Sequence, residues 1–286
     1  MLPAAAALLG RACPFDRAGD VAEEKLFGVA PRIVEMREVG TLVPAPLGAW
    51  DGDALAGVAC VAGNRVRLLA VDPPARGRGV GSALLAACEA AGGSRAVDQP
   101  GNYLAPGIDE RNADAIAWLE RRGWQRTGEP RVNVLVAVRD NPRVSAARVA
   151  ALTATAAARG YEVRRATADE RALLDAVATE FGGAWPFELA RALAQPEPGV
   201  HVALRDGAYC GFAAHDGNNA GLGWFGPTGT WPAHRGQGLG EVLLLACLVD
   251  VARDHTRCEV AWIGPRPFYD KVAGIVDERR FIAMSR

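Results

Sequence analysis

Short apolar runs and longer apolar stretches alternate along the chain in an order that occurs twice. Residues 55–61 and 65–71 are rich in valine, leucine and alanine and flank Gly63-Asn64, a pattern typical of a β-hairpin. Residues 80–91 follow as an apolar helical stretch that ends at Gly92-Gly93. The first half therefore predicts a hairpin whose second strand leads into a helix.

The same order returns in the second half of the chain. Residues 200–205 and 209–215 resemble the first hairpin, with Gly211 standing where Gly57 stood. A strand at 224–230 then leads into a long helix at 239–255, and further strands are expected at 259–263 and 279–284. Two similar halves of this length indicate two whole domains and exclude a short solenoid repeat.

The remaining patterns place the domain boundaries. The alternating residues 131–139 predict a strand that closes the first domain, and Asn141-Pro142 marks its end. We expect a first domain at 1–141, an alanine-rich helical connector at 142–160 and a second domain at 161–286. Within the second domain, Thr167 and Glu170 have the spacing of a capping box that opens a helix at 168–181.

Each half carries a glycine-rich turn between its strand and its helix. The two turns read Arg76-Gly77-Arg78-Gly79-Val80-Gly81 and Arg235-Gly236-Gln237-Gly238-Leu239-Gly240. Such a turn gathers unpaired N–H groups and the positive end of a helix dipole at one point, which favours a bound anion such as a diphosphate. One such turn could be purely steric, but the likeness continues through Leu84/Leu243 to Cys88/Cys247 and favours a binding site.

The order of the glycines excludes two common nucleotide sites. A dinucleotide fingerprint needs Gly-x-Gly-x-x-Gly and a downstream acidic residue, and a nucleoside triphosphate loop needs Gly-Lys-Ser/Thr. Neither pattern is present in these two turns.

The motif Arg-x-x-Gly-x-Gly resembles the pyrophosphate loop of the GNAT N-acetyltransferases, which bind acetyl-coenzyme A. The resemblance covers nearly the whole chain as a tandem GNAT protein, an arrangement also found in mycothiol synthase. It implies an α/β (α+β) fold of two tandem GNAT-type domains, each a mixed, mostly antiparallel twisted sheet flanked by helices. It also implies acetyl-CoA contacts at Leu69, Val71, Arg76, Gly77, Arg78, Gly79, Gly81, Ser82, Thr228, Thr230, Arg235, Gly236, Gln237, Gly238 and Gly240.

The same resemblance implies that the two halves differ in their catalytic residues. The segment Pro267-Phe268-Tyr269-Asp270-Lys271 is similar to the family's Phe-Tyr-x-Lys segment, whose tyrosine often protonates the leaving thiolate. The matching segment of the first half has Leu119 at the tyrosine's place, and leucine cannot donate a proton. We therefore expect the second domain to be catalytic through Tyr269, and the first to bind the cofactor without the usual acid.

The sequence leaves two questions about the second half undecided. Glu241 stands where the first copy has Ser82, and a carboxylate there suits the helix dipole but opposes a phosphate, which favours the first loop as the stronger binder. The general base cannot be read from the sequence. Candidates near strand or helix ends are Glu180, His215, Asp216 and Glu259.

Composition adds few constraints. The 286 residues are half apolar with a net charge of −1, so we expect neither nucleic acid nor membrane as a partner. The apolar opening lacks a basic region and no long apolar run follows, which indicates a cytoplasmic protein. We interpret the six cysteines as reduced core residues and expect no metal, because the histidines lack ligand spacing.

These observations predict a cytoplasmic acyltransferase, a monomer or homodimer, that moves an acetyl group from acetyl-CoA to a primary amine of a small molecule or peptide. The amine would attack directly in a ternary complex. A non-catalytic CoA-binding or sensing module is the alternative, favoured in the first half by Leu119. A transferase for longer acyl chains also stays open.

Overall fold

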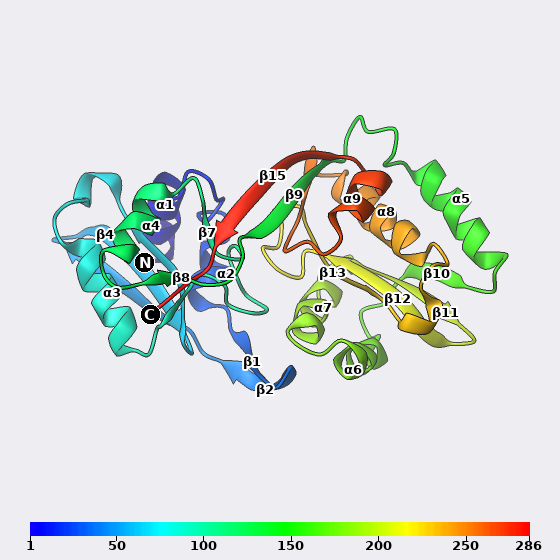
Figure 1. Ribbon diagram of the computed structural model, residues 1–286, viewed down its shortest axis with the longest axis horizontal. Helices are drawn as coiled ribbons and strands as arrows, with labels where there is room; N and C mark the ends of the chain where they lie inside the picture. The colour runs from blue at the N-terminus through cyan, green and yellow to red at the C-terminus, as the bar shows by residue number, and fades with distance from the viewer. The chain divides into compact units, whose positions relative to one another are not determined.

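The computed structural model describes the whole chain, Met1–Arg286. The chain forms two compact units, each with its own sheet and helices (Figure 1). Unit 1 consists of Met1–Val34, Glu38–Val132 and Arg279–Arg286, and unit 2 consists of Glu35–Arg37 and Asn133–Glu278. Both units combine mostly antiparallel sheets with flanking helices, which confirms the predicted fold class.

Unit 1 is built around a six-stranded sheet with the order β3-β4-β5-β6-β16-β8. Its strands are β3 (Ala45–Asp51), β4 (Ala54–Ala62), β5 (Arg65–Val71), β6 (Arg95–Ala96), β8 (Gln125–Arg126) and β16 (Met284–Ser285). The strand β7 (Ile108–Asp109) lies outside this sheet, and β1 (Ala30–Val34) and β2 (Arg37–Leu42) form a separate two-stranded sheet. Its helices are α1 (Leu2–Ala12), α2 (Ala22–Phe27), α3 (Val80–Ala90), α4 (Ala113–Glu120) and the 3-10 turn η1 (Pro73–Ala75).

Two layers of helices cover the sheet of unit 1. A Cβ at Gly57 of β4 would lie 2.8 Å from a methyl group of Leu84, so α3 packs closely on this face. On the other face the Cys60 thiol donates to the carbonyl of Leu26 in α2. Successive strand residues point to opposite faces, which explains why β4 is apolar almost throughout.

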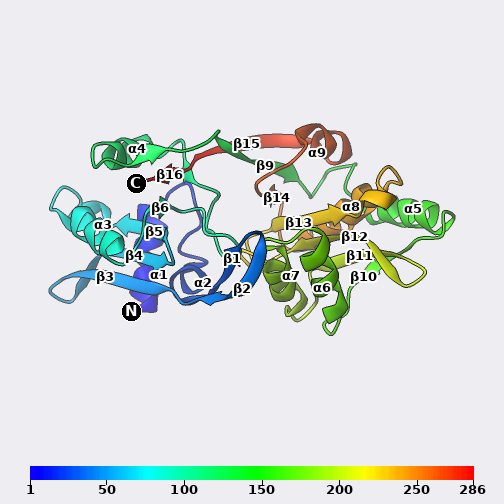
Figure 2. The same ribbon diagram turned by 60° about the horizontal axis from the view of Figure 1, so that its bottom comes forward.

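Unit 2 repeats this plan with the strand order β10-β11-β12-β13-β14-β9-β15, while the end of β15 from Arg279 on belongs to unit 1, where it pairs with β7. Its strands are β9 (Arg131–Ala137), β10 (Glu162–Arg165), β11 (Val200–Arg205), β12 (Ala208–His215), β13 (Trp224–Thr230), β14 (Arg257–Val260) and β15 (Ile275–Ile282). Its helices are α5 (Ala146–Ala157), α6 (Arg171–Glu180), α7 (Trp185–Leu193), α8 (Leu239–Val251), α9 (Arg266–Val272) and the 3-10 turn η2 (Pro232–His234). Figure 2 shows α6 and α7 lying together on one side of the sheet.

The core of unit 2 also has two layers. A Cβ at Gly211 of β12 would lie 3.0 Å from Leu243, so α8 packs against that face. The neighbouring Phe212 points the other way and meets the rings of Phe181 and Trp185 edge to face. The helix α8 is buried on almost every side, in keeping with its continuous apolar sequence.

The predicted boundary between the domains is corrected by the strand pairing. The segment expected to close the first domain instead joins unit 2, where Val134 of β9 pairs with Val260 of β14. The last residues of the chain join unit 1, where Met284 pairs with Ala96 on one side and Arg126 on the other. The expected connector is α5, which also belongs to unit 2. Strand alternation predicts a strand but not the sheet that it enters.

Two further elements differ from the sequence prediction. The helix expected at 168–181 is Arg171–Glu180, with Glu170 at its N-cap position, where the Glu170 carboxylate accepts bonds from Arg164, Tyr209 and the N–H of Thr167. The strand expected at 259–263 is Arg257–Val260 instead. None of the helices combines the length and the apolar character that crossing a lipid bilayer requires.

Candidate functional site

In both units the strand before the glycine loop separates from its parallel neighbour. In unit 1, β5 pairs with β6 only at Arg65/Arg95 and Val66/Ala96, and then continues to Val71 paired with β4 on its other side. In unit 2, β13 pairs with β14 only at Trp224/Glu259 and Phe225/Val260 and continues to Thr230. Each separation opens a wedge beside a strand that ends at a glycine loop.

The glycines of both loops are required by backbone conformation. Gly77 and Gly79 have φ values of 77° and 86°, and Gly236 and Gly238 repeat them at 76° and 84°. No atom lies within 4 Å of a Cβ built on any of the four, so crowding does not explain them. The loops therefore leave open space beside helix N-termini, as a bound diphosphate requires.

The first arginine of each motif supports the loop. The Nε of Arg76 donates to the carbonyl of Val71 at 3.3 Å, and the Nε of Arg235 donates to the carbonyl of Thr230 at 3.2 Å. Arg78 forms an exposed ion pair with Asp51 at 2.8 Å. The guanidinium groups thus hold the turns in place, and the backbone N–H groups are the anion donors that the geometry offers.

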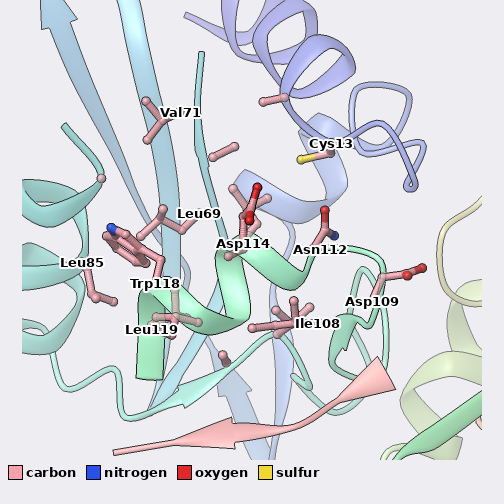
Figure 3. A pocket seen from close by; sticks show the side chains of 18 of the residues that line it. Cys13, Leu69, Val71, Leu85, Ile108, Asp109, Asn112, Asp114, Trp118 and Leu119 are labelled. Carbon is pink, nitrogen blue, oxygen red and sulfur yellow. The ribbon is translucent and has the colours of Figure 1, made fainter. Parts of the chain in front are cut away.

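A cavity of about 980 Å³ occupies the wedge of unit 1 (Figure 3). Of the residues predicted to contact acetyl-CoA in this half, only Arg78 is absent from its wall. The predicted residues that line it are Leu69, Val71, Arg76, Gly77, Gly79, Gly81 and Ser82. The structure thus brings the end of β5 and the first loop together around one open space.

The helix α4 forms the opposite wall of this cavity. A Cβ at Gly81 would lie 3.4 Å from the ring of Trp118, so the aromatic side chain approaches the loop. Arg122 stacks on the Trp118 ring at 4.0 Å and donates to the Ser82 hydroxyl at 2.9 Å. Leu119 also lines the cavity, which therefore has an apolar side chain where the family has its tyrosine (Figure 3).

One end of the cavity carries charged residues that sequence reasoning missed. Asp16 follows α1, Asp109 lies in β7, and Arg279 in the C-terminal segment donates to both carboxylates. Arg111 also pairs with Asp109 at 2.6 Å and lies over the Phe15 ring at 4.5 Å. Asp16, Asp109 and Arg279 are far apart in the sequence, so no local motif could have indicated this cluster.

The two carboxylates respond differently to this environment. Burial raises the pKa of Asp16 despite its contact with Arg279. Burial would also raise the pKa of Asp109, but hydrogen bonds from Arg111 and Arg279 outweigh it and lower the pKa. Burial raises the pKa of the nearby Cys13 thiol to about 12, so this cavity residue is a neutral thiol near pH 7.

In unit 2 the predicted donor Tyr269 lies in α9 with a side chain that is 6% exposed. Its ring meets Phe225 of β13 and Phe268 edge to face, with centroid distances of 6.5 and 5.1 Å. Burial raises the pKa of Tyr269 to about 12, so the phenol keeps its proton at neutral pH. Phe268 approaches Gly240 as Trp118 approaches Gly81, which places Tyr269 and Leu119 at matching positions.

The other predicted residues of unit 2 lie on or beside the second loop. The Thr228 hydroxyl donates to the carbonyl of Phe212 at 3.0 Å, so this side chain supports the sheet. The carbonyl of Gln237 accepts a bond from Arg159 at 3.0 Å. Thr230 ends the strand, directly before the loop.

Most candidates for the general base belong to polar networks. His215 contacts Asp216 at 2.8 Å, and although burial lowers its pKa, the hydrogen bond with Asp216 and the carboxylate of Asp250 at 3.6 Å raise the pKa to about 9. It is therefore protonated near pH 7 and a poor base. Glu259 accepts a bond from Asn133 at 2.6 Å, and Glu180 is exposed at the end of α6.

Comparison with known families agrees with this geometry. Residues 46–126 match the description "Acetyltransferase (GNAT) domain", and residues 170–274 match "Acetyltransferase (GNAT) family". The chain belongs to the GNAT acetyltransferases. Each match includes one glycine loop, so the chain is a tandem GNAT protein. No curated protein sequence is similar enough to this chain to count as a match.

Solved structures share the fold at low sequence identity. A tandem GNAT protein from the clavulanic acid biosynthesis pathway is 19% identical over 94% of each chain, with a TM-score of 0.57. A GCN5-related N-acetyltransferase from Sphaerobacter thermophilus is 19% identical, with a TM-score of 0.59 over 100% of this chain and 92% of that one. A glucosamine N-acetyltransferase region of a fungal multidomain β-N-acetylglucosaminidase gives a TM-score of 0.72 at 15% identity, and this tandem GNAT chain spans 37% of that protein.

Proposed function

We propose that this protein transfers an acetyl group from acetyl-CoA to a primary amine of a small molecule or peptide, by direct attack in a ternary complex. The observation that carries the proposal is Tyr269, a buried phenol that stays protonated beside the wedge of unit 2. Acetyl-CoA supplies a thioester that an amine can attack. The protein then has to bind the diphosphate, position the thioester and protonate the departing thiolate.

The residues of both loops fit a diphosphate. The four glycines with positive φ leave a space that a Cβ would enter, and the helix N-termini point N–H groups toward it. In unit 1, β5 and α4 would hold the rest of the cofactor in the cavity described above. In unit 2, β13 would align the thioester next to Tyr269.

Tyr269 would donate its proton to the thiolate, whose ordinary pKa is about 8.5. A phenol with a pKa of about 12 keeps its proton near neutral pH, where a small fraction of an amine nucleophile is already deprotonated. Unit 1 lacks this donor at Leu119. We propose that unit 1 binds the cofactor without comparable turnover, which retains the CoA-binding module as a second candidate function for that half.

Release of free thiol from acetyl-CoA, measured with a panel of amines, tests the proposal. The panel should include glucosamine, because a structural neighbour is described as a glucosamine N-acetyltransferase, together with amino acids, diamines and peptides. Tyr269→Phe should lower kcat by about 100-fold across pH 7 to 9. Leu119→Phe in unit 1 is the matched control and should leave most of the turnover in place.

Two results would contradict the proposal. Full activity of Tyr269→Phe would remove the acid from unit 2. Two bound cofactors per chain without amine-dependent thiol release would favour the binding module instead. The proposal also includes a cytoplasmic location, with which the six free cysteines agree, and a monomer or homodimer.

A further inference from the structure

Two arginines, Arg148 in the connector helix α5 and Arg159 just after its end, contact the second glycine loop and the start of α8. Arg148 donates to the Glu241 carboxylate at 2.6 Å, and Arg159 donates to the carbonyl of Gln237 at 3.0 Å. Glu241 lies in the first turn of α8, directly after the loop. The helix that the sequence predicted as a connector therefore reaches the predicted diphosphate site of unit 2.

Arg148 is held firmly in this position. One guanidinium nitrogen donates to the carbonyl of Val272 at the end of α9 and to the carbonyl of Arg143, each at 2.8 Å. Its backbone N–H is capped by the hydroxyl of Ser145. Both side chains of the Arg148–Glu241 pair are 29% exposed, so solvent screens the pair only in part. Arg148 thus joins α5, α8 and α9 around a single carboxylate.

Comparison with the matching position in unit 1 shows what the Arg148–Glu241 pair contributes. There Ser82 replaces Glu241, and Arg122, in the turn after α4, donates to its hydroxyl at 2.9 Å. Both units therefore fix the residue after the loop with an arginine, but only unit 2 has a carboxylate to neutralise. Without a nearby cation, that carboxylate would repel a diphosphate at the same helix N-terminus.

We propose that Arg148 is a positioning residue for coenzyme binding in unit 2: it neutralises Glu241, so that the second glycine loop accepts a diphosphate. This inference rests on the proposed function, because it takes the loop to be a coenzyme site. It assigns to the connector a role in the acyltransferase site that lies outside the matched domain residues 170–274.

Calorimetric titration with coenzyme A tests the inference. The background variant Gly79→Val distorts the first loop, so the remaining binding reports unit 2. In this background Arg148→Met should weaken binding about tenfold at low salt, and the loss should shrink as salt screens the exposed carboxylate. Adding Glu241→Gln should restore binding to within about threefold of the background, because the uncompensated charge is removed. Arg148→Lys, which keeps the charge, should bind like the background.

The matched control is Arg122→Met in a Gly238→Val background. It removes a bond to a neutral hydroxyl and should weaken the first site by a clearly smaller factor. Unchanged binding by Arg148→Met, or a double variant as weak as Arg148→Met, would overturn the inference while the proposed function stands. Absence of coenzyme binding by the unmodified chain would overturn the proposed function and this inference with it.

Discussion

Met284 pairs with Ala96 across the sheet of unit 1, although most of unit 2 lies between them in the sequence. Both side chains are buried in the core cluster that also contains Leu84 and Trp124. The C-terminal strand is therefore an internal part of unit 1, placed between β6 and β8.

Shortening Met284 to alanine should destabilise unit 1. The side chain is fully buried, and removal of a buried methionine of this kind costs about 2–5 kcal/mol. Thermal unfolding followed by calorimetry should show a lower transition for unit 1. Met36→Ala, at a methionine that is 64% exposed, is the matched control and should change stability by less than about 0.5 kcal/mol. Equal effects of the two variants would contradict the buried position of β16.

Arg279→Ala should destabilise the same unit by a different mechanism. It removes a cation that contacts Asp16 and Asp109, whose side chains are 14% and 2% exposed, and breaking such a buried pair costs about 3–5 kcal/mol. Because Arg111 still pairs with Asp109, we expect a loss near the lower end. The neighbouring Arg280 forms an exposed pair with Glu110, so Arg280→Ala should cost about 1 kcal/mol at most. Urea unfolding compares the two variants.

The two glycine loops should bind coenzyme A independently, so the number of coenzyme molecules bound per chain should report each loop separately. Gly79→Val and Gly238→Val each force a β-branched residue into a left-handed backbone conformation that such residues rarely adopt. Each variant should lose one of two coenzyme A sites, and the double variant should lose both. Gly10→Ala, at a glycine with open space and ordinary φ, should keep both sites. A single variant that abolishes all binding would contradict two independent loops.

The stability of unit 2 should fall as pH rises from about 6.5 to about 9. His215 titrates near pH 9 in the folded protein and near 6.5 when unfolded, so its charged form favours folding and this contribution is lost at alkaline pH. The shift corresponds to roughly 3 kcal/mol. The carboxylates Asp216 and Asp250 have lowered pKa values, so their contribution is instead lost as pH falls below about 4.

Urea unfolding at pH 6 and pH 9.5 measures this dependence. His215→Gln should be clearly less stable than the unmodified chain at pH 6, and the difference should largely disappear at pH 9.5. A difference that stays constant between the two values would show that His215 acts by packing alone. His234→Gln is a suitable comparison, because the His234 ring contacts Tyr161 instead of these aspartates.

Local sequence patterns predicted much of the fold and both glycine loops. The hairpin of β4 and β5 and both glycine loops follow from turn chemistry and apolar runs, which depend on neighbouring residues only. The exchange of strands could not be predicted in this way, because residues 279–284, two arginines followed by four apolar residues, carry no local signal of which sheet they enter. The contact of Arg148 with Glu241 was equally hidden: the sequence indicated the problem that Glu241 poses, but a partner 93 positions away has no local signal.

The exchange of strands has a consequence for synthesis. While the ribosome is still making unit 2, the sheet of unit 1 has a vacant place between β6 and β8, since the segment that fills it is translated after unit 2. The first half must therefore wait, incompletely folded and with two unsatisfied strand edges, until β16 leaves the ribosome. Expression of residues 1–141 by themselves would leave the protein permanently at that unfinished stage.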